Sequence, residues 1–380
     1  MSIYKLLLET IYNIIITMKI MLKILRLTMC AVLAAFVLLP AACNTGGEQR
    51  HFTAFNNVDI TVQARGATLT DGAADKIRAL ITELNAEFSA TVNTSTVSKI
   101  NSASAGDSVN ISERFKFVAD VCGKMYEFTE GKFDPSVYPL SVLWQFSPNF
   151  PVANFAVPTD EEITATKELI GYDKFTFGGT WATKTLDGAK IDFGGALKGY
   201  CSDKIAEIMA ADGIKGGYVN VGGSSINILS VDSLSIVHPR NRTENILTVK
   251  LSEDNLAVST SGDYEKNYTT GGKTYSHLID ASSGRPAETG VASATVIGRN
   301  GLKLDALTTA LCLFSHDFKT PENGELYKFI QKILASEDFT GAQVFAVCIN
   351  GEEKQILTNK KQGDDFTLND SGYRIITVRV

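Results

Sequence analysis

Apolar and polar positions along the chain follow two periods, one helical and one typical of strands. Apolar residues recur every three or four positions, which predicts helices, over residues 73–88, 114–129, 159–170, 197–209, 302–314 and 320–334. Shorter alternating or continuous apolar runs predict strands at residues 52–65, 218–221, 225–229, 343–349, 354–358 and 373–380. The polar run at residues 95–101 is expected to be a loop. Helices interleaved with strands indicate the α/β (α+β) class.

A pair of glycines marks the entrance of one of these helices. A short apolar run ends at Asp192, Gly194 and Gly195 follow, and Gly213 ends the helix. Glycines let backbone N–H groups approach a ligand closely, and a helix N-terminus carries about half a positive charge, which favours phosphate. Lys198 adds a full charge. Paired glycines before a helix are also ordinary turn chemistry, so this segment alone leaves phosphate binding and a plain turn both open.

Composition and charge narrow the class of protein. The chain has 380 residues, of which 44% are hydrophobic and 21% charged, and its formal net charge is −6. These values are typical of a globular protein with a sizeable core. The acidic balance and the lack of clustered lysine and arginine argue against a nucleic-acid partner. No repeat or long linker divides residues 52–380, so we expect them to form one intertwined α/β unit.

The amino-terminal region has the pattern of an export signal. Basic residues after Met18 precede an apolar run and two alanines, so residues 1–42 are expected to be a signal peptide whose true start is Met18. The next residue, Cys43, resembles the lipidated first residue of bacterial lipoproteins, and residues 43–51 then form a polar tether. Pro40 stands where such signals usually carry leucine, so cleavage without lipidation and a retained transmembrane helix are the alternatives.

Four further cysteines lie in apolar helical or strand patterns. None of them shows the close spacing of a metal site or a redox pair. We therefore expect buried free thiols at Cys122, Cys201, Cys312 and Cys348.

Residues 131–146 contain more aromatic residues and prolines than a simple connection needs. The sequence GKFDPSVYPLSVLWQF predicts a loop stiffened by two prolines. Such a loop would present Tyr138 and Trp144, and aromatic side chains on a rigid loop can stack on a flat ring. The alternative is that Trp144 fills the core.

Residues 258–280 hold a second group of polar candidates. Ser261, Gly262 and Asp263 stand together, a turn at two glycines follows, and His277 comes near the end. The chain has only four histidines. A histidine in such a position is a candidate for catalysis, although a structural role is the commoner one.

Asp305 and Thr309 stand four residues apart on an otherwise apolar helix. This spacing puts both side-chain oxygens on one face, where a hard cation such as Mg²⁺ would find ligands. The alternative is that Asp305 lies in the exposed first turn of the helix and that Thr309 bonds back to a carbonyl.

Taken in order, these stretches resemble the ApbE family, the FAD:protein FMN transferases, over nearly the whole mature chain. The segments that carry the resemblance are GKFDPSVYPLSVLWQF, IDFGGALKGY, VNVGG, VHPR, STSGDYEKNY, YSHLIDASSGRPA, ASATVIG and LKLDALTTAL. Three positions depart from the family pattern. Leu197 stands where alanine is frequent, Ala281 stands where proline is usual, and the region from Phe88 to Asn101 lacks the aromatic residue that many members carry near Thr91.

The resemblance implies a T-fold-like architecture of two interlocked α/β subdomains over residues 52–380, with FAD in the cleft between them and Mg²⁺ at its diphosphate. The implied metal ligands are the side chains of Asp305 and Thr309 and a backbone carbonyl of Ala196 or Leu197. The residues implied to contact FAD are Tyr138, Asp192, Gly194, Gly195, Lys198, Ser261 and Gly262.

The implied reaction transfers FMN from FAD to a threonine hydroxyl of an acceptor flavoprotein and releases AMP, with His277 or Asp263 as the base. Two alternatives are an Mg²⁺-dependent FAD pyrophosphatase and a lipoprotein that binds FAD without turnover. The expected partners are extracytoplasmic flavoproteins, such as subunits of sodium-pumping NADH:quinone reductase or Rnf-type complexes. The expected location is the outer face of a membrane, or the periplasm, through a lipid on Cys43.

Overall fold

The computed structural model describes residues 47–55, 57–148 and 150–380. The expected signal peptide and Cys43 lie outside the described residues. Across the described ranges, no helix combines the length and the apolar character that crossing a bilayer requires.

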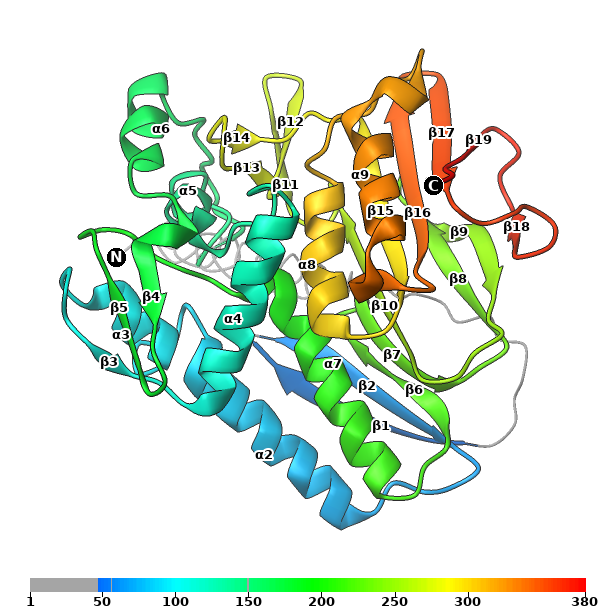
Figure 1. Ribbon diagram of the computed structural model, residues 1–380, viewed down its shortest axis with the longest axis horizontal. Helices are drawn as coiled ribbons and strands as arrows, with labels where there is room; N and C mark the ends of the chain where they lie inside the picture. Colours follow the sequence, from blue (N-terminus) through cyan, green and yellow to red (C-terminus); the bar gives the residue numbers. More distant parts are fainter. Residues whose placement is uncertain (1–46, 56, 149) are drawn as a thin grey trace, which may run out of the picture. The chain divides into compact units, whose positions relative to one another are not determined.

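A nine-stranded sheet forms the centre of the molecule (Figure 1). Its neighbouring strands pair antiparallel, except that the last two, β17 and β19, run parallel. In spatial order the strands are β1 (Gly47–Ala54), β2 (Val58–Arg65), β6 (Gly216–Val221), β7 (Ser225–Ser230), β10 (Leu256–Gly262), β15 (Val291–Gly298), β16 (Gln343–Asn350), β17 (Glu353–Thr358) and β19 (Arg374–Thr377).

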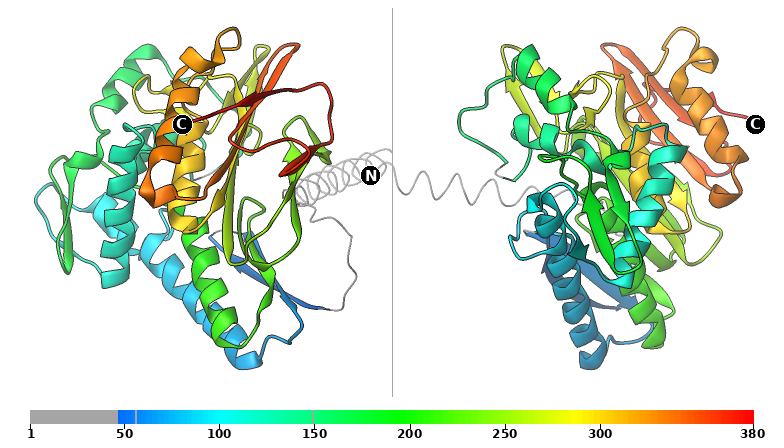
Figure 2. Two further views of the ribbon diagram at one scale, coloured as in Figure 1. Left: turned by 45° about the vertical axis from the view of Figure 1, so that its right-hand side comes forward. Right: turned by 60° about the vertical axis from the view of Figure 1, so that its left-hand side comes forward.

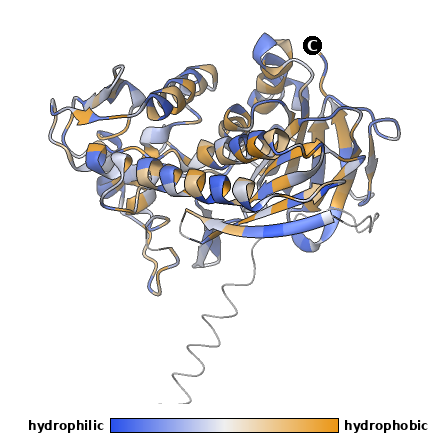
Figure 3. Ribbon diagram, turned by 90° about the horizontal axis from the view of Figure 1, so that it is seen from below, coloured by the Kyte–Doolittle hydropathy of each residue, from blue (hydrophilic) through white to orange (hydrophobic). Residues whose placement is uncertain are grey.

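Different elements pack on the two faces of this sheet (Figure 2). One face packs in a large apolar core against helices α2 (Asp71–Phe88), α4 (Glu113–Phe128), α7 (Gly194–Ala211), α8 (Gly301–Leu311) and α9 (Glu325–Ala335). The other face packs in a second core against a three-stranded sheet of β18 (Phe366–Leu368), β9 (Asn241–Lys250) and β8 (Ser233–His238). The edge strand β1 is mostly hydrophilic, as Figure 3 shows, which suits a strand exposed on its outer side.

Shorter elements build the remaining parts. A third apolar cluster joins α5 (Tyr138–Leu143) and α6 (Asp160–Lys167) to two small hairpins, β11 (Asn267–Thr270) with β12 (Lys273–Ser276) and β13 (Ile279–Asp280) with β14 (Arg285–Pro286). A small sheet of β3 (Val109–Asn110), β5 (Trp181–Lys184) and β4 (Phe175–Phe177) lies near α3 (Thr96–Ser102). Four 3₁₀ turns occupy Pro135–Val137, Tyr172–Lys174, Pro321–Asn323 and Glu337–Phe339.

Most of the predicted helices and strands are confirmed. The Thr70 hydroxyl accepts from the Ala73 N–H at the start of α2, and Thr159 with Glu162 forms the predicted capping box of α6. Gly213, at φ 85°, follows the end of α7 in the left-handed conformation. The predicted turn at residues 350–351 joins β16 to β17.

Three predictions for the first part of the chain are wrong. The single strand expected at residues 52–65 is the hairpin of β1 and β2, whose turn includes Phe55 and Asn57 at positive φ. Strand β1 also starts at Gly47, within the stretch expected to be a tether. Residues 95–101 are not a loop but largely helix α3, because the Ser95 hydroxyl caps its start by accepting from the Ser98 N–H.

Three further expectations differ in detail. The stretch 131–146 is not a loop but contains a 3₁₀ turn and helix α5. Each has a proline, Pro135 and Pro139, at its start, where a helix tolerates proline. Trp144 is 1% exposed and its Nε1 donates to the Gly284 carbonyl, so the interpretation that it fills the core is confirmed. Residues 320–334 start as a 3₁₀ turn before Gly324 opens α9, and the last predicted strand is limited to β19.

All four described cysteines are buried and unpaired, as predicted. Burial raises the pKa of every one of these thiols, that of Cys201 to about 12. Each therefore stays protonated and unreactive in the folded protein.

Candidate functional site

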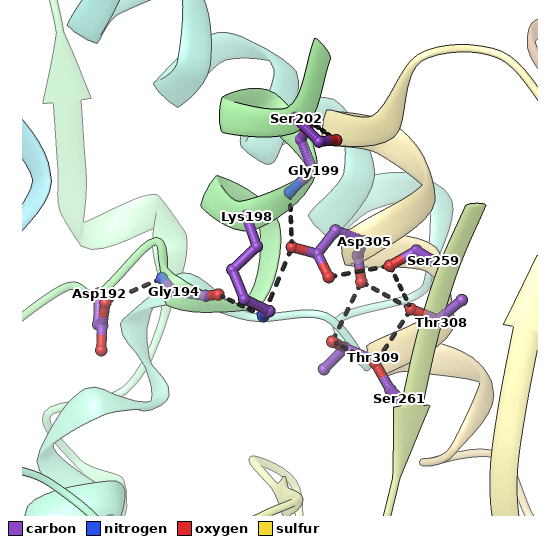
Figure 4. Close-up of polar contacts among 10 residues, drawn as sticks. All are labelled: Asp192, Gly194, Lys198, Gly199, Ser202, Ser259, Ser261, Asp305, Thr308 and Thr309. Carbon is purple, nitrogen blue, oxygen red and sulfur yellow. Dashed lines mark hydrogen bonds and ion pairs between the residues drawn. The ribbon is translucent and has the colours of Figure 1, made fainter. Parts of the chain in front are cut away.

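Helices α7 and α8 cross in close backbone contact, and this crossing builds the candidate site (Figure 4). A Cβ on Gly199 would lie 2.0 Å from the carbonyl oxygen of Gly301, so only glycine allows the approach. The helix pair thereby brings the glycine-rich start of α7 beside the polar residues of α8. Gly199 and Asp305 are 106 positions apart in sequence, yet they become neighbours, and the Gly199 N–H donates to the Asp305 carboxylate.

Asp305 is the buried charge at this crossing. Its side chain accepts from the Gly199 N–H at 3.1 Å and from the Ser259 hydroxyl at 3.0 Å, and Lys198 Nζ lies 3.7 Å from Oδ2 (Figure 4). The residue is 1% exposed, so it does not lie in an exposed first turn and that alternative is excluded. A buried carboxylate needs such partners, because an unpaired charge in the interior is costly.

Hydroxyl groups from β10 and α8 gather next to Asp305. Ser261 Oγ lies 3.0 Å from Thr308 Oγ1 and 3.4 Å from Thr309 Oγ1. The Thr309 hydroxyl is 3.2 Å from the Asp305 carbonyl and donates to it, as the structural alternative foresaw. That bond uses the proton of Thr309 and leaves oxygen lone pairs for a ligand, so it does not conflict with metal binding.

The amino terminus of α7 opens onto the same place. The Gly194 N–H donates to Asp192 Oδ1 at 2.9 Å, and a Cβ on Gly195 would lie 3.6 Å from Thr309 Oγ1. Burial raises the pKa of Asp192, and the bond from Gly194 partly offsets that rise. Lys198 Nζ lies 3.4 Å from the Gly194 carbonyl and is partly exposed. The first turn of α7 therefore offers N–H groups and one cation together.

Ala196 and Leu197 lie inside this first turn rather than in a turn before the helix. Both are buried, at 0% and 4% exposure, and their N–H groups donate to the Phe193 carbonyl. Their carbonyls point along the helix in regular geometry. The expectation that one of them binds a metal stays a prediction.

The oxygen-rich crossing suits a hard cation that arrives with its own ligands. Asp305 supplies one carboxylate, and Thr309 and Ser261 supply hydroxyl oxygens. No cluster of three or more His, Cys, Asp or Glu side chains suited to a metal occurs among residues 47–380 apart from the two undescribed positions. Mg²⁺ is usually held by one or two carboxylates together with phosphate oxygens and water, so these residues fit Mg²⁺ brought by a diphosphate.

His277 presents an unpartnered imidazole nitrogen. Within the described chain its Nδ1 is buried without a hydrogen-bond partner, and its backbone N–H donates to the Lys266 carbonyl. Burial, together with the positive charges of Lys266 and Lys198, lowers the pKa of His277 to about 3. The imidazole is therefore neutral at physiological pH and has a nitrogen lone pair available.

Asp263 is engaged in an ion pair. Arg240 donates to both of its carboxylate oxygens, at 2.6 and 2.7 Å. Such a bidentate pair fixes the direction of the carboxylate. Of the two candidate bases, His277 is thus the one without a competing partner.

Tyr138 and Gly262 are more closely packed by neighbouring residues than the sequence suggested. Tyr138 is 6% exposed and its hydroxyl lies 3.4 Å from the Ala90 carbonyl, so it is not displayed on a loop. A Cβ on Gly262 would lie 2.4 Å from the ring of Tyr264, so a side chain there would displace that ring. Their contacts with FAD stay predictions.

Several residues of the site escaped the sequence analysis. Arg240 lies in the VHPR segment and Gly199 in the IDFGGALKGY segment, but neither segment shows which distant residue each one meets. The other residues that were missed are Ser259, Lys266 and Thr308. Arg240, directly after Pro239, is the one of these residues that the local sequence could have marked as a candidate.

Comparisons with known proteins identify the family. The model of the ApbE family matches residues 56–320. An FAD:protein FMN transferase of Vibrio cholerae is 28% identical over 292 residues, which cover 74% of this chain and 86% of the relative. One from Escherichia coli K12 is 32% identical over 48% of this chain and 54% of the relative.

Solved structures show the same fold. The ApbE protein of Thermotoga maritima has a TM-score of 0.67 at 26% identity, over 80% of this chain and 94% of that one. The flavinyl transferase ApbE of Pseudomonas stutzeri, in apo form, has a TM-score of 0.68 at 23% identity, over 82% and 94%.

Proposed function

The chain belongs to the ApbE family, and we propose on that basis that it acts as an FAD:protein FMN transferase that modifies a hydroxyl of an acceptor flavoprotein. The observation that carries the proposal is the α7–α8 crossing, where buried Asp305, the Thr309 hydroxyl and the amino terminus of α7 with Lys198 meet. A dinucleotide diphosphate needs a cation site and favours a helix N-terminus, and the crossing places the two side by side.

The proposed chemistry is a phosphoryl transfer. A threonine Oγ of the acceptor forms a bond to the FMN-side phosphorus of FAD, and the bond from that phosphorus to the bridging oxygen breaks. AMP leaves with the bridging oxygen, and the hydroxyl proton passes to a base. Positioning and charge neutralisation supply most of the rate in reactions of this type.

Each part of the site has a proposed task. Gly194 and Gly195 lie against the diphosphate, which the Gly195 N–H and the ammonium of Lys198 bind, while Ser261 and Gly262 line the opposite side. Asp192 holds the Gly194 N–H and so fixes the start of α7. The ring of Tyr138 supports the flavin side.

We further propose Mg²⁺ as the cofactor, held by Asp305, Thr309 and a carbonyl of Ala196 or Leu197. When bound there, Mg²⁺ would neutralise negative charge on the diphosphate. Ser259 and the Gly199 N–H orient the Asp305 carboxylate, and such supporting bonds matter for metal affinity.

We assign His277 as the base, because its Nδ1 has no partner among the described residues while Asp263 is paired with Arg240. Lys266 and Lys198 lower the pKa of His277 in the free protein. A bound diphosphate offsets positive charge, so substrate binding would raise that pKa and make the imidazole a stronger base.

The decisive experiment uses the chain without its leader. The protein is incubated with FAD, Mg²⁺ and a candidate acceptor flavoprotein, and flavin fluorescence on the denatured acceptor is measured together with released AMP. Transfer gives fluorescent acceptor and AMP in equal amounts. Free FMN with AMP and unlabelled acceptor would instead indicate a pyrophosphatase, and retained FAD without AMP would indicate a storage protein.

We also propose that a lipid on Cys43 anchors the protein to the outer face of a membrane, near acceptor subunits of membrane redox complexes. The pattern of basic residues, apolar run and cysteine after Met18 supports this. A Cys43→Ser variant is expected to leave the membrane fraction while keeping its activity on soluble acceptor. Membrane fractionation unchanged from the parent would disprove the lipid anchor.

A further inference from the structure

A second contact between α7 and α8 lies one helical turn away from the site. Asp203 of α7 accepts from two consecutive backbone N–H groups at the start of α8, from Gly301 at 3.0 Å and from Leu302 at 3.3 Å. Asn227 of β7 donates to the same carboxylate at 2.9 Å. One side chain thus ties together α7, α8 and the central sheet.

This contact completes the amino terminus of α8. Asn300, at φ 72°, caps the Lys303 N–H with its side chain, and its carbonyl accepts from Leu304. With Asp203 holding the two N–H groups before these, the first four N–H groups of α8 are all satisfied. The start of α8 is therefore fixed in position and orientation by a residue of α7.

The geometry couples this contact to the metal ligand. Gly199 stands four residues before Asp203 on α7, and Asp305 stands four residues after Gly301 on α8, so the two helices run antiparallel. Besides the close backbone contact of Gly199 with Gly301, two sets of hydrogen bonds join them, one from Asp203 to Gly301 and one from Asp305 to Gly199. A shift of α8 at the first contact must change the second, because helices move as rigid bodies on this scale.

We propose that Asp203 is a positioning residue for the reaction: it holds α8 so that Asp305 meets the Gly199 N–H and faces the diphosphate. This role rests on the proposed function of the site.

The identity of the residue favours this role over simple capping. Burial, with a smaller contribution from the negative charge of Glu207 on the same helix, raises the pKa of Asp203 to about 6 against the lowering effect of its hydrogen bonds. The ionised form therefore lowers stability at neutral pH, and a neutral Asn or Ser would cap a helix without that cost. Only a carboxylate accepts from two adjacent N–H groups while also binding Asn227.

The test compares two capping aspartates on the same helix. Asp203→Asn keeps the shape but offers one oxygen in place of two. Asp212→Asn is the matched control, because Asp212 at the far end of α7 also accepts from the amino terminus of a neighbouring helix, through the N–H and hydroxyl of Thr70, both at 2.8 Å.

For Asp203→Asn we expect a fall in kcat of about tenfold or more, since misplacement on the ångström scale has effects of this size, with little change in KM for FAD. The Mg²⁺ concentration for half-maximal transfer should rise. In ¹⁵N-glycine-labelled protein without FAD or Mg²⁺, the Gly199 amide should shift and exchange faster with solvent. Asp212→Asn should change the thermal midpoint and none of these values.

Unchanged kcat, Mg²⁺ requirement and Gly199 amide in Asp203→Asn would overturn the proposal. Losses of activity that simply follow lost stability in both variants would overturn it as well. If Asp203→Asn does not fold, Asn227→Ser, which removes one bond to the carboxylate, should give a smaller change of the same kind, and its absence decides against the proposal. The amide signal is independent of turnover, so a parent protein without transferase activity would contradict the function and leave this test intact.

Discussion

Replacing Asp305 with asparagine is expected to lower FMN transfer by roughly 100-fold or more while the protein stays folded. The change keeps the shape of the side chain and one acceptor oxygen for the Gly199 N–H, while the new amide group can donate to Ser259, but it removes the negative charge beside Lys198. Mg²⁺ has few protein ligands, so the loss of a charged one should weaken it strongly. FAD binding should persist in part, because the contacts along α7 remain. Initial rates at several Mg²⁺ concentrations measure the effect.

A control on the same helix separates metal binding from helix stability. Lys303 lies on the exposed side of α8 and pairs with Asp338, so Lys303→Ala should leave transfer within about twofold. Parental transfer by Asp305→Asn at saturating Mg²⁺ would contradict the metal assignment. It would leave Asp305 with a structural role, as the partner of Lys198, Ser259 and the Gly199 N–H.

The second large effect is expected at His277. His277→Gln removes the proposed base, and transfer should fall by about 10²–10⁴-fold with little change in KM for FAD. Because the pKa of His277 in the free protein is about 3, the imidazole stays neutral over the whole physiological range. The pH profile of kcat/KM should therefore show no step near pH 6.5 from this residue. Single-turnover rates on a soluble acceptor would measure the loss.

The same substitution should change the acid stability of the protein. The folded pKa of His277 lies below its unfolded value of about 6.5, so the unfolded chain binds the proton first and stability is lost as the pH falls from about 6.5 towards 3. At pH 5 this effect is on the order of 2 kcal/mol. The drop in thermal midpoint between pH 7 and pH 5 should be smaller in His277→Gln than in the parent.

His316 provides the matched control. His316 is also a buried histidine whose Nδ1 has no partner within the described residues, and burial lowers its pKa too. Its neighbours are Gln355 and Phe318, which are not residues of the candidate site. His316→Gln should reduce the acid sensitivity in the same direction and leave transfer intact. Equal loss of transfer in both variants would show that His277 acts through stability alone.

Helices with a one-sided apolar pattern and a capping residue could be predicted from the sequence. In α2, the cap Thr70 and the buried residues Ile77, Ile81 and Leu84 follow the helical period without help from distant residues. Helix α3 was not predicted, because a seven-residue segment shows little periodicity. Its stability comes from tertiary contacts, such as the Asn101 side chain bonded to the backbone of Ile191, across |i−j| = 90.

Some residues of the site could likewise be predicted from local sequence, and others could not. The spacing of Asp305 and Thr309 and the glycines before α7 are local signals, and the structure brings them together at the crossing. The partners Ser259 and Gly199 could not be predicted, since nothing in a local window shows which strand or helix faces α8. The ion pair of Asp263 with Arg240 was equally hidden, and it changes the choice between two candidate bases.

The first strand limits how far an anchored enzyme could work from a lipid surface. Strand β1 begins at Gly47 and pairs with β2 along all eight of its residues, so chain cannot be drawn out of it without breaking the sheet. A lipid on Cys43 would leave four residue steps before that strand, which span at most roughly 14 Å when fully extended. The folded domain would then stay against the bilayer, so the distance of an acceptor's hydroxyl from the membrane, as well as its sequence, would limit which proteins receive the flavin.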